Sequence, residues 1–342
     1  MVSVYDDAPS TQAALRARVE AVPGHVTDAR LGIGGDIFQD LLQDAALVIH
    51  AAASVNLISD FKELQAVNVE GTRNVVDLCL AIGARLVHVS SFSVLGDKLY
   101  ERGFVFKETD FDLQQSFYEE MAYEQSKFEA ERVVREAGYR ELDWAIVRPG
   151  NIFGDSETGC YPLEGVTESG IYYDIVRTVI ETGFCFDYPH DFDVTPVDYA
   201  AKGVLQAGIS ASSGRTYHLT NPEPPSFNQI ADALRSCGYT LRVVGLDEYL
   251  WALADSRMVR AGKPYVSNFT RLMTLSAGED DLIESARYDT AQAACLLRGA
   301  GIACPRVDAG LIQRYVDYCV ARKYLPSPAQ QERFLAQILP AA

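Results

Sequence analysis

A serine, a tyrosine and a lysine stand in this sequence where together they could perform acid–base chemistry on a carbonyl group. Tyr123 and Lys127 lie four residues apart in YEQSKFEAERVV, a helical pattern, so their side chains share one helix face. A phenol has a pKa of ~10, and a nearby ammonium would lower it. Ser91 follows a predicted strand, where it could hydrogen-bond the same substrate oxygen. The Tyr-x-x-x-Lys spacing also occurs where an aromatic residue packs on a core beside a solvated lysine.

The segments that would position these residues alternate between strands and helices. Continuous apolar runs at 46–50, 86–89 and 144–147 predict buried strands, and helical spacing predicts helices at 61–82 and 123–137. This alternation predicts an α/β fold with a parallel, doubly wound, Rossmann-like sheet, which binds ligands at the carboxyl ends of its strands. The other predicted elements are strands at 2–5, through Val26, at 216–219 and at 241–244, and helices at 12–22, 38–45 and 198–208.

The composition and the predicted elements of the chain change after Gly154. Residues 156–192 are rich in Gly, Tyr, Phe and acidic residues, and helices dominate from Ser226 onward. Residues 258–281 show no clear pattern and are interpreted as a loop or lid. We therefore predict two domains. A Rossmann-like domain comprises 1–155 plus 193–221, and a smaller, mostly helical substrate-binding domain comprises 156–192 plus 222–342.

Composition excludes several classes of protein. The chain has 342 residues, and at ~150 residues per domain this length suggests two domains. Thirty basic against 47 acidic residues give a net charge of −17. The chain therefore has no general excess of positive charge that would attract nucleic acid or an anionic membrane. No apolar run approaches the ~20 residues of a membrane span, and the N-terminus does not resemble a signal peptide. The seven cysteines form no Cys-x-x-Cys pair, so we expect reduced thiols, no metal site and a cytoplasmic location.

Several motifs of the chain resemble those of a known superfamily. Six segments occur in the order seen in extended short-chain dehydrogenases/reductases: VIHAAASVN (48–56), NVEGT (68–72), VHVSSFSVLG (87–96), YEQSK (123–127), RPGNIFGD (148–155) and TPVDYAAKGV (195–204). Four more look like the thioester reductase domains that end many nonribosomal peptide and polyketide assembly lines and carboxylic acid reductases: DARLGI (28–33), GDSETG (154–159), RTYHLTNPEPPSFNQIADALRSCGY (215–239) and RYVDYCVARKYLP (314–326). The resemblance covers about residues 1–330.

The resemblance implies an enzyme that uses NADPH, with NADH as the alternative, to reduce an acyl or peptidyl thioester to an aldehyde or alcohol. The thioester would be carried by a phosphopantetheine carrier protein or coenzyme A. Ser91, Tyr123 and Lys127 fall on the family's catalytic triad, with Ser91 preferred over Ser90 and Ser93 because it lies three residues before Val94. Tyr123 would donate the proton, and Lys127 would tune Tyr123 and hold the nicotinamide ribose. The residues expected to bind the cofactor are Ala52, Ala53, Asn68, Tyr123, Lys127, Pro149 and Gly150.

The chain departs from the family at the part that grips the cofactor's diphosphate. The family begins with a strand, a Gly-x-x-Gly-x-x-Gly turn and a helix, which are missing here, and we interpret LGIGGD (31–36) as a turn. Asp6 and Asp7 stand where relatives carry an arginine for the 2′-phosphate of NADPH. Gly24-His25-Val26-Thr27 replaces a Gly-Asp-x-Thr motif that contacts the adenine. We therefore expect weak NADPH binding, from a truncated start or from a lost dinucleotide grip.

Two alternatives remain open at this stage. A reductase-like domain could release its product by cyclisation, without a redox step or cofactor. A truncated, non-catalytic module could dock a carrier protein without turning anything over. A nucleotide-sugar epimerase or dehydratase would share the triad, but the C-terminal motifs argue against it.

Overall fold

The computed structural model describes residues 9–56, 59–101, 103–163, 171–188, 190–245, 247–249 and 286–338. The chain divides into two compact units. The first comprises Met1–Ile152, Val197–Pro222 and Ser285–Cys304, and the second comprises Phe153–Pro196, Glu223–Glu284 and Pro305–Ala342. The first unit thus takes in residues 285–304, which the sequence-based division assigns to the second domain. The domain limits drawn from the sequence stay a prediction.

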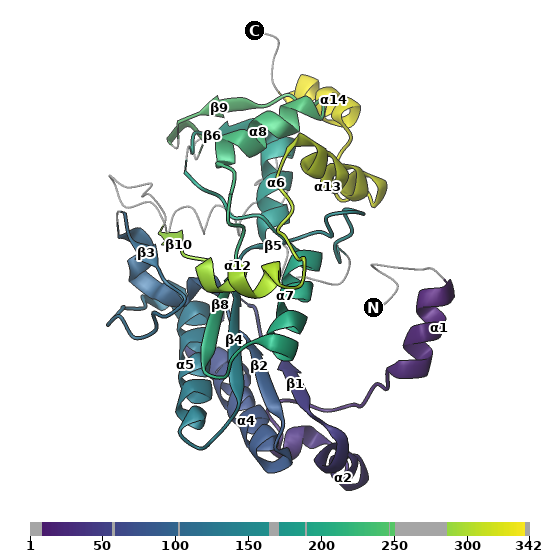
Figure 1. Ribbon diagram of the computed structural model, residues 1–342. Coiled ribbons are helices and arrows are strands. Elements are labelled where there is room, and N and C mark those ends of the chain that lie inside the picture. The colour runs from purple at the N-terminus through teal and green to yellow at the C-terminus, as the bar shows by residue number, and fades with distance from the viewer. Residues whose placement is uncertain are drawn as a thin grey trace. The chain divides into compact units, whose positions relative to one another are not determined.

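The first unit is built on a four-stranded parallel sheet, as the α/β prediction requires (Figure 1). Its strands are β1 (Leu47–His50), β2 (Arg85–Val89), β4 (Trp144–Pro149) and β8 (Arg215–Leu219), in the order β1-β2-β4-β8. The register pairs His50 with His88 and Val89 with Val147, so the carboxyl ends of neighbouring strands are level. Residues that follow these ends are therefore brought to one edge of the sheet.

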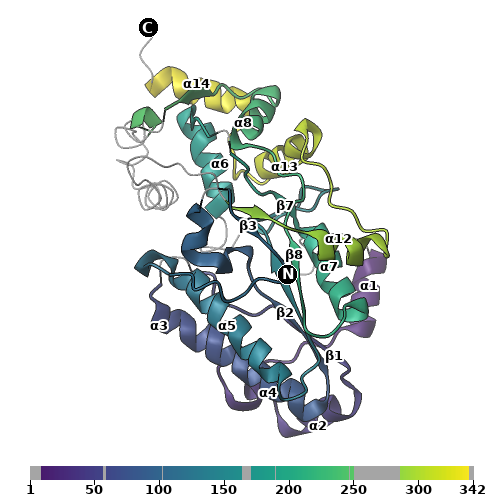
Figure 2. The same ribbon diagram turned by 60° about the vertical axis from the view of Figure 1, so that its left-hand side comes forward.

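Helices cover both faces of this sheet (Figure 2). One face carries α4 (Gly71–Ile82) and α5 (Ala122–Gly138), whose apolar side chains pack with Leu86 and Ile146. The other face carries α7 (Val197–Ser210) and α12 (Ala291–Arg298), which pack with Val87 and with the other strand residues whose side chains point to this face. Because successive side chains of a strand point to opposite faces, double coverage explains the continuous apolar runs.

The first of these strands departs from its prediction. The run at 46–50 suggests a strand buried on both sides, yet β1 is an edge strand among the described residues, and Ile49 is 42% exposed. The strand predicted at 2–5 lies outside the described residues. The strand predicted through Val26 is wrong. Val26 lies in a turn region, where its carbonyl accepts a hydrogen bond from Asn74 Nδ2 (2.8 Å) and its side chain lies against Gly71.

The remaining elements of the first unit are short or lie near its N-terminus. The helices predicted at 12–22 and 38–45 begin and end earlier in the structure, as α1 (Pro9–Arg18) and α2 (Gly35–Asp44). The segment 31–36, interpreted as a turn, contains the end of η2 (Ala29–Gly32) and the start of α2. The others are α3 (Phe61–Leu64), the π-helical η3 (Gln65–Glu70), η4 (Phe92–Tyr100), η5 (Glu119–Met121), and a ladder of β3 (Val105–Phe106) with β10 (Arg287–Tyr288). The chain from α3 through α4 is one helical run, as predicted for 61–82.

The second unit is mostly helical, with an aromatic core. Its helices are α6 (Ile171–Thr182), α8 (Phe227–Ser236), α13 (Ala309–Ala321) and α14 (Pro328–Ile338), and β6 (Phe184–Phe186) pairs in parallel with β9 (Arg242–Val244). A further two-stranded ladder joins β5 (Ile152–Phe153) to β7 (Thr195–Pro196). Phe153, Tyr173 and Tyr315 lie in the core of this unit. No helix in the described part of the chain is long and apolar enough to cross a membrane.

Candidate active site

The end of β2 and one face of α5 bring the three predicted catalytic residues together. Ser91 follows β2 and is the N-cap of η4, where its Oγ accepts a hydrogen bond from the Ser93 backbone N–H (3.2 Å). The Tyr123 hydroxyl lies near the Ser91 side chain, which lowers the pKa of the phenol. One turn further along α5, Lys127 Nζ donates to the Val89 carbonyl oxygen (2.8 Å). The side chains of Ser91 and Lys127 are buried, and that of Tyr123 is half-buried.

The three serines of this loop have different partners, which separates their possible roles. Ser90 Oγ points to the Glu131 carboxylate and donates a hydrogen bond to Oε1 (2.6 Å). Ser93 Oγ lies 2.8 Å from Ser91 Oγ. Among the three, Ser91 is the one whose side chain affects the pKa of the Tyr123 phenol. The preference for Ser91 over its neighbours is therefore consistent with the geometry.

The acidity of Tyr123 differs from the sequence-based expectation. Burial and the neighbouring Glu124 carboxylate raise the pKa of the phenol to about 12, and the Ser91 side chain lowers it only in part. We expected the Lys127 ammonium to lower this pKa, but Lys127 Nζ is held by the Val89 carbonyl. Tyr123 is therefore protonated at neutral pH. That is the form a proton donor needs, because a phenol can donate only the proton it still holds.

Two other groups of α5 titrate close to neutral pH. Burial lowers the pKa of Lys127 to about 8, although the Glu131 carboxylate opposes that shift. Burial raises the pKa of the Glu124 carboxyl to about 7. The charge beside Tyr123 therefore changes between pH 6 and 9, a range in which the activity of such a site is sensitive to pH.

Asn68 holds the loop after β1 to the helix that carries Tyr123. Its Oδ1 accepts from the Ser54 backbone N–H (2.7 Å), and its Nδ2 donates to the Ser54 carbonyl (3.0 Å) and to Ser126 Oγ (2.9 Å). Ser126 in turn donates to the Tyr123 carbonyl (2.7 Å). The amide group is thus occupied by protein partners. The prediction that Asn68 binds the cofactor stays a prediction, and in the described structure its amide joins Ser54 to Ser126.

The described residues offer a place for the nicotinamide end of a dinucleotide. Ala52 is exposed and Ala53 half-buried just after β1, and Pro149 and Gly150 are half-buried at the end of β4. These small or rigid residues stand at the carboxyl edge of the sheet beside Tyr123 and Lys127, where a flat ring and a ribose can approach the backbone. Their chemistry fits that end of the cofactor.

The part of the site that would bind the diphosphate of the cofactor is less complete among the described residues. In the described part of the chain, no strand passes through a glycine-rich turn into a helix. Gly34 is the N-cap of α2 and Gly35 is its first residue, but a Cβ built on either would meet nothing within 4 Å. Asp6 and Asp7 lie outside the described residues. Among the described residues, therefore, no glycine-rich turn forms a cradle for the phosphates.

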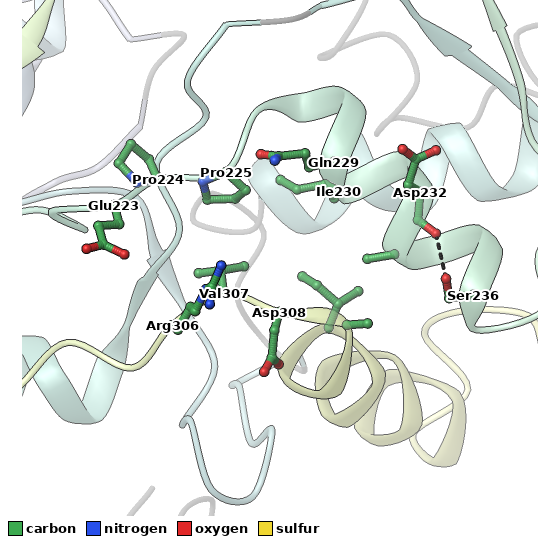
Figure 3. Close-up of a pocket in the computed structure, with 13 residues that line it drawn as sticks. Glu223, Pro224, Pro225, Gln229, Ile230, Asp232, Ser236, Arg306, Val307 and Asp308 are labelled. Atoms are coloured by element: carbon green, nitrogen blue, oxygen red, sulfur yellow. Dashed lines mark hydrogen bonds between the residues drawn. The ribbon is translucent and has the colours of Figure 1, made fainter.

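The second unit has a groove that none of the predicted site residues lines. It has a volume of about 460 Å³ and lies between the loop 223–225 with α8 on one side and residues 306–309 with α13 on the other (Figure 3). Two of its carboxylates already have partners. Asp232 pairs with Arg235 (2.7 Å), and Asp308 Oδ1 caps α13 by accepting from the Leu311 N–H (2.9 Å). We therefore do not place the chemistry there.

Behind Lys127, two buried histidines lie against one another. The rings of His50 and His88 are 5.3 Å apart, and His50 Nε2 is 3.0 Å from Thr72 Oγ1. Neither ring nitrogen of His88 has a hydrogen-bond partner in the described structure. Burial, assisted by the Lys127 charge, lowers the pKa of His50 to about 4 and that of His88 well below its ordinary value of 6.5.

These histidines predict acid sensitivity of the fold. Below pH 6.5 the histidines of the unfolded chain bind protons, whereas the buried imidazoles of the folded chain stay neutral. The contribution of these histidines to stability is therefore present above pH 6.5 and is lost as the pH falls. We expect the free energy of unfolding to fall between about pH 6.5 and pH 4, and His88→Leu to reduce that slope by up to about 1.4 kcal/mol per pH unit. Urea unfolding at several pH values measures the slope. The exposed His25 gives the control His25→Gln, and an equal slope in both variants would contradict the prediction.

A parallel sheet with helices on both faces and with Ser91, Tyr123 and Lys127 at its carboxyl edge is the architecture of the extended short-chain dehydrogenase/reductase class. Residues 3–204 match the family described as male sterility protein (NAD_binding_4), and the chain belongs to that family. The family identified from the sequence motifs is thereby confirmed.

Individual relatives agree with this assignment. The chain is 28% identical over 303 residues to a linear gramicidin synthase of Brevibacillus parabrevis, covering 88% of the chain and 6% of that protein. It is 26% identical over 340 residues to glycine betaine reductase ATRR of Emericella nidulans, covering 94% of the chain and 25% of that protein. The chain therefore spans a quarter or less of either relative. The terminal R domain of the myxalamid PKS-NRPS pathway has a similar structure, with a TM-score of 0.80, 28% identity, and coverage of 92% of this chain and 78% of that one.

Proposed function

We propose that this chain reduces an acyl or peptidyl thioester to an aldehyde, or further to an alcohol, with NADPH as the expected reductant. The observation that carries the proposal is the placement of Ser91, Tyr123 and Lys127 together where β2 ends and α5 begins, at the carboxyl edge of the sheet. The likeness to the terminal R domain of an assembly line supports a substrate tethered to a phosphopantetheine carrier protein, with coenzyme A as the other possible carrier.

The three side chains have distinct roles in this reaction. The nicotinamide, when bound, supplies the hydride for the carbonyl carbon of the thioester. Tyr123 donates its proton to the carbonyl oxygen as negative charge develops there, and Ser91 donates a hydrogen bond to the same oxygen. Lys127 places a positive charge beside them while its pKa of about 8 leaves it protonated at neutral pH. Collapse of the resulting thiohemiacetal breaks the C–S bond and gives the aldehyde and the free thiol.

The test combines binding and turnover. The purified chain is titrated calorimetrically with NADPH and with NADH, and then incubated with an acyl-coenzyme A or an acylated carrier protein. We expect aldehyde, detected by mass spectrometry, only when the reduced cofactor is present. We also expect weaker than micromolar binding of NADPH, because the described residues lack a diphosphate cradle.

The remaining outcomes separate the alternatives. Release of a cyclised product without cofactor would replace this proposal by the redox-independent one, which the lack of a diphosphate cradle among the described residues favours. Carrier binding with no turnover at all would indicate the non-catalytic docking module. Micromolar binding of NADPH would show that the diphosphate is held by residues other than those described.

A further inference from the structure

We infer that Ser90 and Glu131 form a positioning device that fixes the catalytic Ser91 against Tyr123. This inference rests on the proposed function for the role of Ser91, but the contacts that carry it are independent of any substrate. Neither residue touches the reacting atoms. They act through the backbone that connects Ser90 to Ser91.

Helix α5 grips the end of β2 at two successive residues. Lys127 Nζ donates to the Val89 carbonyl oxygen (2.8 Å), and one turn later the Glu131 carboxylate accepts the Ser90 hydroxyl (2.6 Å). Tyr123, Lys127 and Glu131 are spaced at i, i+4 and i+8, so one helix face carries the catalytic phenol and both side chains that bind the end of β2. The helix that places Tyr123 thereby also places the residue before its partner Ser91.

Glu131 itself is held too firmly to follow a movement of Ser90. Arg148 binds it through two hydrogen bonds, Nε to Oε1 and Nη2 to Oε2, each 2.8 Å long, and both side chains are fully buried. Arg135 Nη2 lies 3.3 Å from the same carboxylate. Arg148 is anchored in turn by the Asp110 carbonyl (3.1 Å) and by the ring of Phe106, 4.6 Å from its guanidinium carbon. The Ser90 hydroxyl is therefore tied to a rigid point by a charge-assisted hydrogen bond.

The far end of the Ser91 loop has an anchor of its own. Asp97 N–H donates to the Ser116 carbonyl, and Ser116 N–H donates to Asp97 Oδ1, both at 2.9 Å. Gly96 permits this approach at φ 59°, since a Cβ there would lie 2.5 Å from the Ser116 oxygen. At the near end, the Ser90 N–H donates to the Val147 carbonyl oxygen (2.8 Å), and the Ser90 hydroxyl bond to Glu131 is the side-chain anchor nearest to Ser91. Loss of that side-chain bond loosens the part of the loop that must keep Ser91 close to Tyr123.

The experiment removes the Ser90 hydroxyl and leaves the buried ion pair in place. Ser90→Ala is compared with Ser90→Thr, which restores a hydroxyl, and with Thr216→Val as the matched control. Thr216 is also buried, and its hydroxyl accepts from Arg135 Nη2 (2.7 Å), so its loss disturbs the same network away from the end of β2. Steady-state thioester reduction and hydrogen–deuterium exchange of the backbone amides of residues 91–96 are measured for each variant.

We expect Ser90→Ala to lower kcat about 10- to 100-fold, the effect of misplacing a reacting group by up to about 1 Å, with KM nearly unchanged. Its amides at 91–96 should exchange faster, and Ser90→Thr should restore both readouts. Thr216→Val should change neither. Equal kcat and equal exchange in Ser90→Ala and wild type would overturn the inference, as would equal losses in Ser90→Ala and Thr216→Val. If wild type reduces no thioester, the proposed function fails, whereas the exchange data still decide whether Ser90 fixes the loop.

Discussion

Tyr123→Phe is expected to lower the rate of thioester reduction by about two to four orders of magnitude, the usual effect of removing a positioned acid. The phenol keeps its proton at neutral pH because burial raises its pKa to about 12, and its hydroxyl already lies near the Ser91 side chain. Phenylalanine keeps the ring and its packing, so the loss would be confined to the hydroxyl and its proton. Single-turnover kinetics with saturating NADPH measure the chemical step.

A second tyrosine provides the control. Tyr139 follows the same helix and is 93% exposed, so Tyr139→Phe should leave the rate unchanged. Thermal melting should show that both variants remain folded. Equal turnover by Tyr123→Phe and wild type would remove Tyr123 from the mechanism, whatever the fate of the other site residues.

The strands and helices near the site could be predicted because their signals are local. An apolar run marks a strand covered on both sides, and a four-residue spacing puts Tyr123 and Lys127 on one helix face. The choice of Ser91 among the three serines came from the resemblance to the family, whose catalytic serine lies three residues before the position of Val94. In each case the pattern lies within one element, so no knowledge of neighbouring elements is needed.

What could not be predicted depends on contacts between distant segments. The bonds that join Asn68 to Ser54 and Ser126, and Ser90 to Glu131, link residues 14 to 58 positions apart. A serine or glutamate in the sequence carries no mark of such a partner. The pKa of Tyr123 was misjudged because burial, with the Glu124 carboxylate, raises it. The spacing along a helix does not show how deeply a phenol is buried.

The position of β1 at the edge of the sheet could not be predicted from its sequence. Its sequence has the pattern of an inner strand, but within the described residues it pairs only with β2, and Ile49 is 42% exposed. Leu205 and Ile209 of the covering helix α7 are also exposed, at 51% and 67%. Apolar composition reports what a strand can bury, whereas its place in the sheet depends on which other strands are present.

The second large effect is expected from breaking the buried ion pair. Glu131→Gln should lower the free energy of unfolding by about 3–5 kcal/mol at neutral pH, because it leaves the Arg148 guanidinium buried without a counter-charge. Both side chains are fully buried and joined by two 2.8 Å hydrogen bonds. Urea unfolding of Glu131→Gln, of a control variant and of the wild type measures the loss of stability. The control is Glu129→Gln, on the same helix, whose 3.3 Å pair with Arg132 is partly exposed and should contribute at most about 1 kcal/mol.

The pH dependence of this effect distinguishes a lost charge from a lost contact. Burial alone would raise the pKa of Glu131, but Arg148, followed by Arg135 and Ser90, lowers it to about 2, against an ordinary value of 4.5. Since the folded pKa is the lower one, this carboxylate stabilises the fold above pH 4.5, and the contribution is lost as the pH falls towards 2. The gap between wild type and Glu131→Gln should therefore narrow below pH 4.5. A constant gap, or one no larger than that of Glu129→Gln, would mean that the Glu131 charge does not stabilise this fold.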